Sequence, residues 1–340
     1  MKFKNKAEQN LSIVQKLIAK DGAKGWNVAK ETLLQQKTDN IQLRQALAYL
    51  TLIPDFFRPA VVSYCCEAVG GEPAVTVPTS ASLILFAKAI GIHDDIIDNV
   101  KKRKKHITVF GRFGKEVALV LSDILLFKGF TLLRKNLEIG VSPTTLRRIL
   151  ETIDHVWFEQ SESEIFEQQS RADVNVLPEK CLTKINKRAS EFEVVTRIGA
   201  ILGEAPQKDI EALASYGRLT GTASLLRDEL IDMLELDVLK HRIRKESLPL
   251  PIVYALQDTA AKSKIIPLIS QGKAAKQDLI ELTKTVDMFN GLNYVANLIN
   301  DMVYKACSCV QGFHKKDKLL LIANTLRIDQ REWKQVLDAM

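Results

Sequence analysis

Two groups of acidic side chains share a spacing that suits metal binding. Asp94 and Asp98 are four residues apart, and so are Asp228 and Asp232. Residues at i and i+4 lie on one face of a helix, so each pair would present two carboxylates one turn apart. Asp95 points roughly 100° away from Asp94 and could support the first pair only from its flank.

Both pairs follow apolar sequence, in which carboxylates are costly unless a cation neutralises them. Mg²⁺ suits hard oxygen ligands, and it usually binds one or two carboxylates, several waters and the oxygens of a substrate phosphate. Two facing pairs would hold Mg²⁺ ions around one diphosphate and neutralise it as it leaves. The alternative is that each pair is a solvated acidic patch, and finding two pairs in apolar sequence argues against it.

The composition is that of a globular protein with a basic surplus. Of 340 residues, 46% are hydrophobic and 26% are charged, and the formal net charge is +7. A basic surplus suits anionic partners such as phosphorylated small molecules. Apart from the run 101–105, the basic residues are spread along the chain, and no nucleic-acid-reading motif is present. We therefore expect a small phosphorylated ligand and no nucleic acid.

The cysteines and the N-terminus indicate in which compartment of the cell the protein is found. The five cysteines are odd in number and lack Cys-x-x-Cys spacing, which argues against a disulfide framework and a zinc site. Reduced thiols fit the cytosol. The N-terminus is polar, and no run of 18 apolar residues occurs. These features predict a cytoplasmic protein without a transmembrane segment.

Helices must position the carboxylates, because little in the sequence interrupts a helical pattern. Only 10 prolines and 16 glycines occur, and no strand-like alternation persists. We predict an all-α, single-domain helical bundle over residues 1–340, with a central cavity. Lys240–Pro251 is predicted to be a basic loop. The predicted helices cover 6–20, 40–52, 79–99, 113–138, 179–203 and 207–235, and others begin after Arg58-Pro59 and Ser142-Pro143.

With these motifs the chain resembles the trans-isoprenyl diphosphate synthases, the polyprenyl synthetase family. The segment His93–Asp98 looks like the first aspartate-rich motif of that family. Asp228–Asp232 is similar to the second motif, with Glu229 at the usual second aspartate. The resemblance is strongest over residues 50–260. Further matches are Arg58-Pro59, Arg103, Thr108, Asp123, Gly217, Gly221 and Lys245–Pro249.

The resemblance implies the isoprenoid synthase fold, a homodimer, an allylic prenyl diphosphate substrate and Mg²⁺, with roughly three ions once substrate binds. The implied metal ligands are Asp94, Asp95, Asp98, Asp228 and Asp232. The implied diphosphate contacts are Arg58, Arg103, Lys104, Lys245 and Lys187 or Arg188. The implied catalytic residues are Asp94, Asp98, Asp228, Arg103 and Lys245.

The departures from the family fall mainly where it binds isopentenyl diphosphate. Asp55 stands in place of a phosphate-binding lysine, and a carboxylate there would repel a diphosphate. Ala87 replaces a histidine or glutamine, Lys104 replaces an arginine, and Ser224-Leu225 replace a Phe-Gln pair. The half of the site that ionises the allylic substrate therefore looks complete, and the acceptor half looks rebuilt.

Four functions remain compatible with this pattern. The first, which we predict, is condensation with isopentenyl diphosphate, using neighbouring bases such as Lys101, Lys102 or Lys105. The second is prenyl transfer to another acceptor, for example an aromatic one. The third is a class I terpene synthase-like reaction, and the fourth is a non-catalytic subunit of a heteromeric synthase. The intact acidic motifs argue against the fourth.

Two residues before the first motif are candidates for setting the length of the prenyl tail, as residues at this place do in the family. Ala89 is small and lies five residues before Asp94, whereas the larger Phe86 lies eight before it. A small side chain followed by a ring one turn away predicts a pocket with its floor at Phe86, suited to a tail of roughly C15 to C25.

Overall fold

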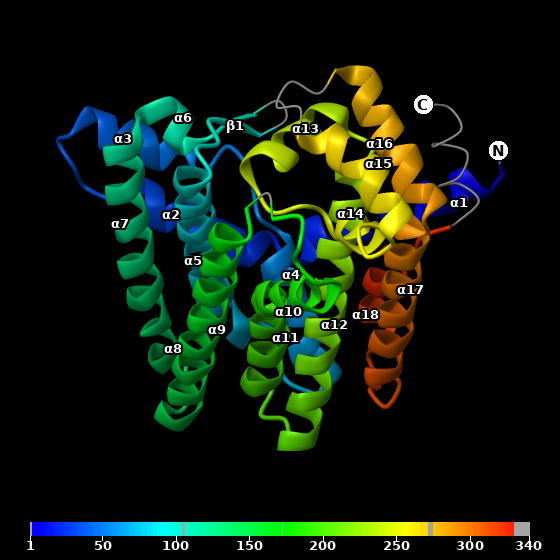
Figure 1. Cartoon of the computed structure of the whole chain (residues 1–340). Coiled ribbons are helices and arrows are strands. Elements are labelled where there is room, and N and C mark those ends of the chain that lie inside the picture. The colour runs from blue at the N-terminus through cyan, green and yellow to red at the C-terminus, as the bar shows by residue number, and fades with distance from the viewer. Residues whose placement is uncertain (1, 104–105, 172, 271–274, 330–340) are drawn as a thin grey trace. The chain divides into compact units, whose positions relative to one another are not determined.

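The computed structural model describes residues 2–103, 106–171, 173–270 and 275–329. Within them the chain is helical nearly throughout, and the sole sheet is a two-stranded hairpin (Figure 1). The predicted all-α fold is confirmed.

Helices of very different length follow one another along the chain (Figure 1). The first part contains α1 (Lys2–Asp21), α2 (Ala23–Leu34), α3 (Ile41–Tyr49), α4 (Phe57–Ala68), the 3-10 helix η1 (Pro73–Thr76), α5 (Val77–Ile97), β1 (Lys102–Arg103), β2 (His106–Ile107), α6 (Val109–Phe113), α7 (Lys115–Leu133), α8 (Lys135–Glu138) and α9 (Pro143–Gln169). The second part contains α10 (Pro178–Arg188), α11 (Ser190–Leu202), α12 (Gln207–Asp232), α13 (Leu236–Lys245), α14 (Leu250–Ala255), α15 (Thr259–Ser270), α16 (Lys276–Met288), α17 (Gly291–Cys309) and α18 (Asp317–Asn324).

The contacts divide the chain into two compact units. The first unit consists of Met1–Thr152, Val195–Glu211 and Phe313–Leu319. The second consists of Ile153–Val194, Ala212–Gly312 and Leu320–Met340. The single domain expected over residues 1–340 stays a prediction.

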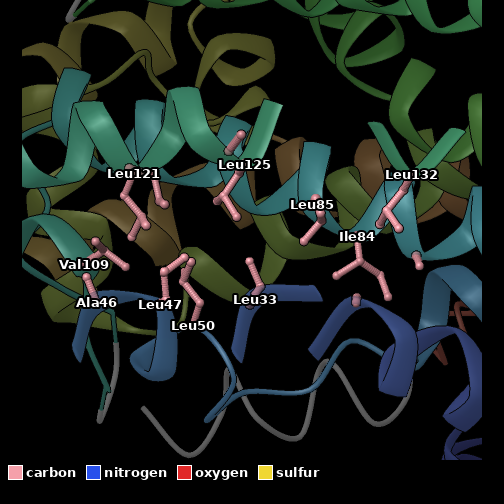
Figure 2. Close-up of a cluster of buried hydrophobic side chains, with 14 of the residues drawn as sticks. Leu33, Ala46, Leu47, Leu50, Ile84, Leu85, Val109, Leu121, Leu125 and Leu132 are labelled. Carbon is pink, nitrogen blue, oxygen red and sulfur yellow. The ribbon is translucent and has the colours of Figure 1, made fainter. Parts of the chain in front are cut away.

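Helix α5 lies at the centre of the first unit, in contact with α2, α4 and α7. Leu83, Ile84, Leu85 and Phe86 are consecutive and all buried, as expected of a helix that is apolar on every side. Figure 2 shows Ile84 and Leu85 among leucines from α2, α3 and α7. In the described residues, the helix Pro73–Ile97 alone is long and apolar enough to cross a membrane, but 67% of its apolar window is buried, as in a core helix.

Small residues bring α5 and α7 close together. The Ser82 hydroxyl donates to the Gly129 carbonyl at 2.6 Å, and the Ser122 hydroxyl donates to the Ala89 carbonyl at 3.1 Å. The Phe86 ring packs over Gly129, and its centroid lies 4.9 Å from that of Phe130. The apolar helix that ends in the first acidic motif is therefore fixed along its length by α7.

In the second unit, a polar stripe on α9 holds α10. Gln160, Ser163 and Glu167 lie on one face of α9 at helical spacing. Gln160 donates to the Arg188 carbonyl at 2.6 Å, and the Ser163 hydroxyl donates to the Lys184 carbonyl at 3.2 Å. Glu167 accepts a hydrogen bond of 2.5 Å from the Lys184 ammonium.

The element boundaries differ from the sequence-based expectations at three places. The helix expected over 113–138 begins after Gly114, which takes a positive φ of 87°, and it is divided at Arg134 between α7 and α8. The helix expected over 179–203 is divided at Ala189. The predicted loop Lys240–Pro251 is wrong for 240–245, which belong to α13, and for 250–251, which begin α14. Many charged residues obscured α13, whose buried Leu239, Arg242 and Ile243 nevertheless follow helical spacing.

We predict that Gly129→Ala destabilises the protein. A Cβ atom there would lie 2.5 Å from a Phe86 ring carbon, so the ring or the helix must move, at a cost of about 1–3 kcal/mol. Gly91→Ala on α5 is the matched control, because its Cβ would meet nothing within 4 Å. Urea denaturation should show a lower unfolding free energy for Gly129→Ala alone, and equal stability of the two variants would refute the close packing.

A second prediction concerns acid stability. Burial raises the pKa of Glu167, but the Lys184 charge and hydrogen bond, together with Ser247, outweigh burial and hold the pKa at about 2, below its ordinary 4.5. A depressed carboxyl pKa adds stability above pH 4.5 that is lost as the pH falls toward 2, here on the order of 3 kcal/mol. The difference in unfolding free energy between wild type and Glu167→Gln should therefore shrink from pH 5 to pH 2. A pH-independent difference would contradict this assignment.

Candidate functional site

The first acidic motif forms the C-terminal end of α5. Asp94 and Asp95 occupy the last turn and Asp98 caps it, with its N–H donating to the Asp94 carbonyl at 2.9 Å. Asn99 follows with a left-handed φ of 54°, and the Val100 N–H donates to the Asp95 carbonyl at 2.8 Å. This is the Schellman ending of a helix, and it keeps Asp94 and Asp98 one turn apart as the sequence predicted.

The electrostatics of this end favour a bound cation. The C-terminal end of a helix carries partial negative charge, so three carboxylates there repel the helix dipole as well as each other. Burial raises the pKa of Asp95 above its ordinary value, the Arg103 hydrogen bond opposes this, and the neighbouring Asp98 charge adds to it. A divalent cation would relieve each of these costs.

A basic hairpin follows directly. In the antiparallel pair of β1 and β2, Arg103 lies opposite His106. The Arg103 Nε–H donates to Asp95 Oδ1 at 2.7 Å, and 58% of the Arg103 side chain is exposed. Thr108 holds the hairpin base, since its hydroxyl donates to the Val100 carbonyl at 2.8 Å. Arg103 therefore lies beside the first motif as predicted, whereas Lys104 lies outside the described residues.

The second acidic motif ends α12, and its three acids differ. Glu229 is buried and accepts from the Leu250 N–H at 2.7 Å and from Arg242 at 3.1 Å. Asp232, predicted as a metal ligand, accepts from Arg242 at 2.8 Å. Asp228 is exposed. Arg242 thus pairs with two of the acids, Glu229 and Asp232, and Asp228 is the most exposed acid of this motif.

Side-chain hydrogen bonds hold the backbone at two of the predicted cations of the second unit. Lys245, exposed, is the last residue of α13. Lys187 forms an ion pair with Glu162. Arg188 is half-buried, and its carbonyl accepts the bond from Gln160 described above. The Asn186 carbonyl, one residue before Lys187, accepts from Arg218 at 2.8 Å.

Arg58 forms an ion pair with Asp55, the residue that departs most from the family pattern. The Arg58 guanidinium donates to Asp55 Oδ2 at 2.5 Å, and the Arg58 N–H donates to Asp55 Oδ1 at 3.2 Å. The nearby Lys88 ammonium donates to the Ile53 carbonyl at 3.1 Å and lies over the Trp26 ring. The positive charge of Arg58, a predicted diphosphate contact, is therefore neutralised by Asp55.

The predicted tail-length residues both face α7. Ala89 is fully buried in the core cluster shown in Figure 2, and Phe86 is buried against Gly129. Ala87, next to Phe86, and Ser224-Leu225 on α12 are half-buried.

The predicted site residues are divided between the two units. The first unit holds Asp94, Asp95, Asp98, Arg58 and Arg103, and the second holds Asp228, Asp232, Lys187, Arg188 and Lys245. That both acidic motifs face one diphosphate stays a prediction. Among the described residues, no three His, Cys, Asp or Glu side chains group closely enough to hold a metal. A metal here would need oxygens from substrate and water, which is how Mg²⁺ usually binds.

Sequence analysis missed the buried partners Arg242, Glu167 and Lys184. The positions of Arg242 and Ile243, three and four residues after Leu239, would have indicated a helix face that carries a buried cation. Nothing local indicates the pairing of Glu167 with Lys184, which are 17 residues apart on different helices.

Comparison with known proteins indicates the same family as the sequence motifs do. The polyprenyl synthetase family model matches residues 41–286. A geranylgeranyl diphosphate synthase of Methanosarcina mazei is 26% identical over 247 residues, which cover 71% of this chain and 74% of that protein. A (2E,6E)-farnesyl diphosphate synthase of Mycobacterium tuberculosis is 32% identical over 177 residues, 51% of this chain and 47% of that protein.

Among solved structures, geranylgeranyl pyrophosphate synthetase from Pyrococcus horikoshii matches with a TM-score of 0.83 and 23% identity, over 93% of this chain and 99% of that one. This likeness shows a shared fold. With the family match spanning most of the sequence and the aspartate motifs at the ends of α5 and α12, the chain belongs to the polyprenyl synthetase family.

Proposed function

We propose that this protein is a Mg²⁺-dependent prenyltransferase that ionises an allylic prenyl diphosphate and condenses the cation with isopentenyl diphosphate. The observation that carries the proposal is the set of Asp94, Asp95 and Asp98 at the negative end of α5, with Arg103 beside it. Relatives named as prenyl diphosphate synthases support the reaction class.

In the proposed mechanism, Asp94 and Asp98 in the first motif and Asp228 in the second would hold Mg²⁺, which when bound would supply positive charge to neutralise the leaving diphosphate. Arg103 has further guanidinium N–H groups besides the one bound to Asp95, and these can contact diphosphate oxygens. Lys245 and Lys187 add positive charge. The allylic C–O bond breaks as diphosphate leaves, and the double bond of isopentenyl diphosphate attacks the allylic cation to form the new C–C bond. The proton lost from the resulting cation passes to the released diphosphate.

A specific observation favours a second candidate function. The Arg58 guanidinium pairs with Asp55, so this segment offers little net positive charge to a second diphosphate. The alternative is prenyl transfer to an acceptor without a diphosphate, for example an aromatic one.

The decisive experiment incubates the protein with Mg²⁺ and farnesyl or geranylgeranyl diphosphate, with and without isopentenyl diphosphate, and measures released diphosphate and product length. We expect Asp94→Asn to reduce release by at least about 100-fold, since metal ligands contribute several kcal/mol. Asp301→Asn, which alters an exposed ion pair with Lys305, is the control and should retain activity.

The products separate the possibilities. Elongation supports condensation with isopentenyl diphosphate. Release without elongation supports another acceptor or a terpene synthase-like reaction. Wild-type protein that releases no diphosphate, like Asp94→Asn, would contradict the proposal and favour a non-catalytic subunit.

We further propose that Phe86 limits the prenyl tail to roughly C15 to C25. Its ring fills the space between α5 and α7 over Gly129. Phe86→Ala should open this space and shift the product or the preferred substrate to a longer tail, as measured by chromatography of dephosphorylated products. An unchanged length distribution would assign Phe86 to the core alone.

The homodimer and the cytoplasmic location expected from the sequence are also proposals. Exposed apolar side chains on α7, among them Phe127 and Phe130, fit a second copy of this chain. The five cysteines are free thiols, which fits the reducing cytoplasm.

A further inference from the structure

The segment 245–250, which begins with Lys245, is held by two buried carboxylates. The Ser247 N–H donates to Glu167 Oε1 at 2.6 Å, and the Leu250 N–H donates to Glu229 Oε2 at 2.7 Å. A backbone bridge between Arg171 and Ser247 joins the same segment to the residues that follow α9. The backbone is therefore fixed at Ser247 and Leu250, two and five residues after Lys245.

The first of these carboxylates belongs to a buried ion pair. Only 5% of the Lys184 side chain and 7% of the Glu167 side chain are exposed. The Lys184 ammonium donates to Glu167 Oε2 at 2.5 Å and to the Ser247 hydroxyl at 2.8 Å. The N–H and the hydroxyl of Ser247 thus both contact this ion pair.

A buried ion pair needs a reason beyond packing. Removing two charges from water is costly, and apolar residues of similar volume often serve stability as well or better. Charge-assisted hydrogen bonds, however, are short and directional, so they fix a backbone segment more exactly than apolar contacts do. Here both charges point at one serine in a loop.

Arg242, three residues before Lys245, is also held. The Arg242 Nε–H approaches Glu246 Oε2 at 3.2 Å, while the same guanidinium contacts Glu229 and Asp232 of the second acidic motif. The exposed Lys245 therefore stands between two held points and is linked through Arg242 to the end of α12.

We propose that Glu167 and Lys184 are positioning residues whose ion pair, through Ser247, holds Lys245 where it meets the diphosphate. This inference rests on the proposed function, which gives Lys245 its ligand. Neither Glu167 nor Lys184 touches the substrate, and their effect passes through the backbone of 245–247.

The test is a double-mutant cycle on Glu167→Gln and Lys245→Ala, read as the Kd of Mg²⁺ with inorganic pyrophosphate by calorimetry. Each single variant should weaken binding by about tenfold, because displacing a contact group loses its oriented interaction. The double variant should bind no more weakly than Lys245→Ala, because both changes remove one contact. With farnesyl diphosphate, Glu167→Gln should raise KM more than it lowers kcat.

Three further variants separate positioning from general stability. Asn300→Ala removes hydrogen bonds to Ile328 elsewhere in the second unit and should lower stability without changing the Kd. Lys184→Arg keeps the cation and should preserve binding. Ser247→Ala removes only the hydroxyl contact and leaves no buried charge unpaired, so it should weaken binding moderately even if Glu167→Gln fails to fold.

The inference is overturned if Glu167→Gln and Ser247→Ala bind pyrophosphate like the wild type, if the cycle is additive, or if Asn300→Ala weakens binding equally. A normal Kd for Lys245→Ala would also overturn it. The Asp94→Asn assay tests Mg²⁺-dependent prenyl transfer independently of this result.

Discussion

Negative charge placed at the end of an apolar helix governs the structure around the first motif. Helix α5 is buried on every side over Leu83–Phe86, and its last turn carries Asp94 and Asp95 with Asp98 as the cap. The helix dipole and mutual repulsion make this arrangement unfavourable without positive charge. The hairpin that follows brings Arg103 to Asp95, yet Arg103 is largely exposed and can contact a ligand as well.

The second motif meets the same constraint in a different way. Glu229 and Asp232 share the buried Arg242, which also reaches the residue after Lys245. The protein therefore uses two acids of this motif to build a framework and exposes Asp228. This explains why a longer side chain stands at position 229, since the Glu229 carboxylate reaches both Arg242 and the Leu250 N–H.

The segment that we propose for the acceptor side carries a charge reversal at Asp55. A charge reversal at Asp55 would repel a diphosphate if it faced the ligand directly. In the structure Asp55 instead binds Arg58, so the change removes an available cation as well as adding an anion. Both effects act in the same direction, against a second diphosphate, and they are why a neutral acceptor is a serious alternative.

The sequence by itself determined the helical class, the family and the spacing of the acids. Helical periodicity and i, i+4 spacing are local, so the ends of α5 and α12 and the adjacency of Asp94 and Asp98 could be predicted from neighbouring residues alone. Local pattern failed at α13, where charges obscured a helix with a buried arginine.

Only the tertiary structure decided which charges are used internally. Arg242 reaches Glu229 across 13 positions, and Ser247 reaches Glu167 across 80. Such pairings depend on how helices pack, and no local spacing encodes them. Burial then makes each pairing strong, because a charge removed from water must find a partner. The fold thereby determines which acids pair with internal cations.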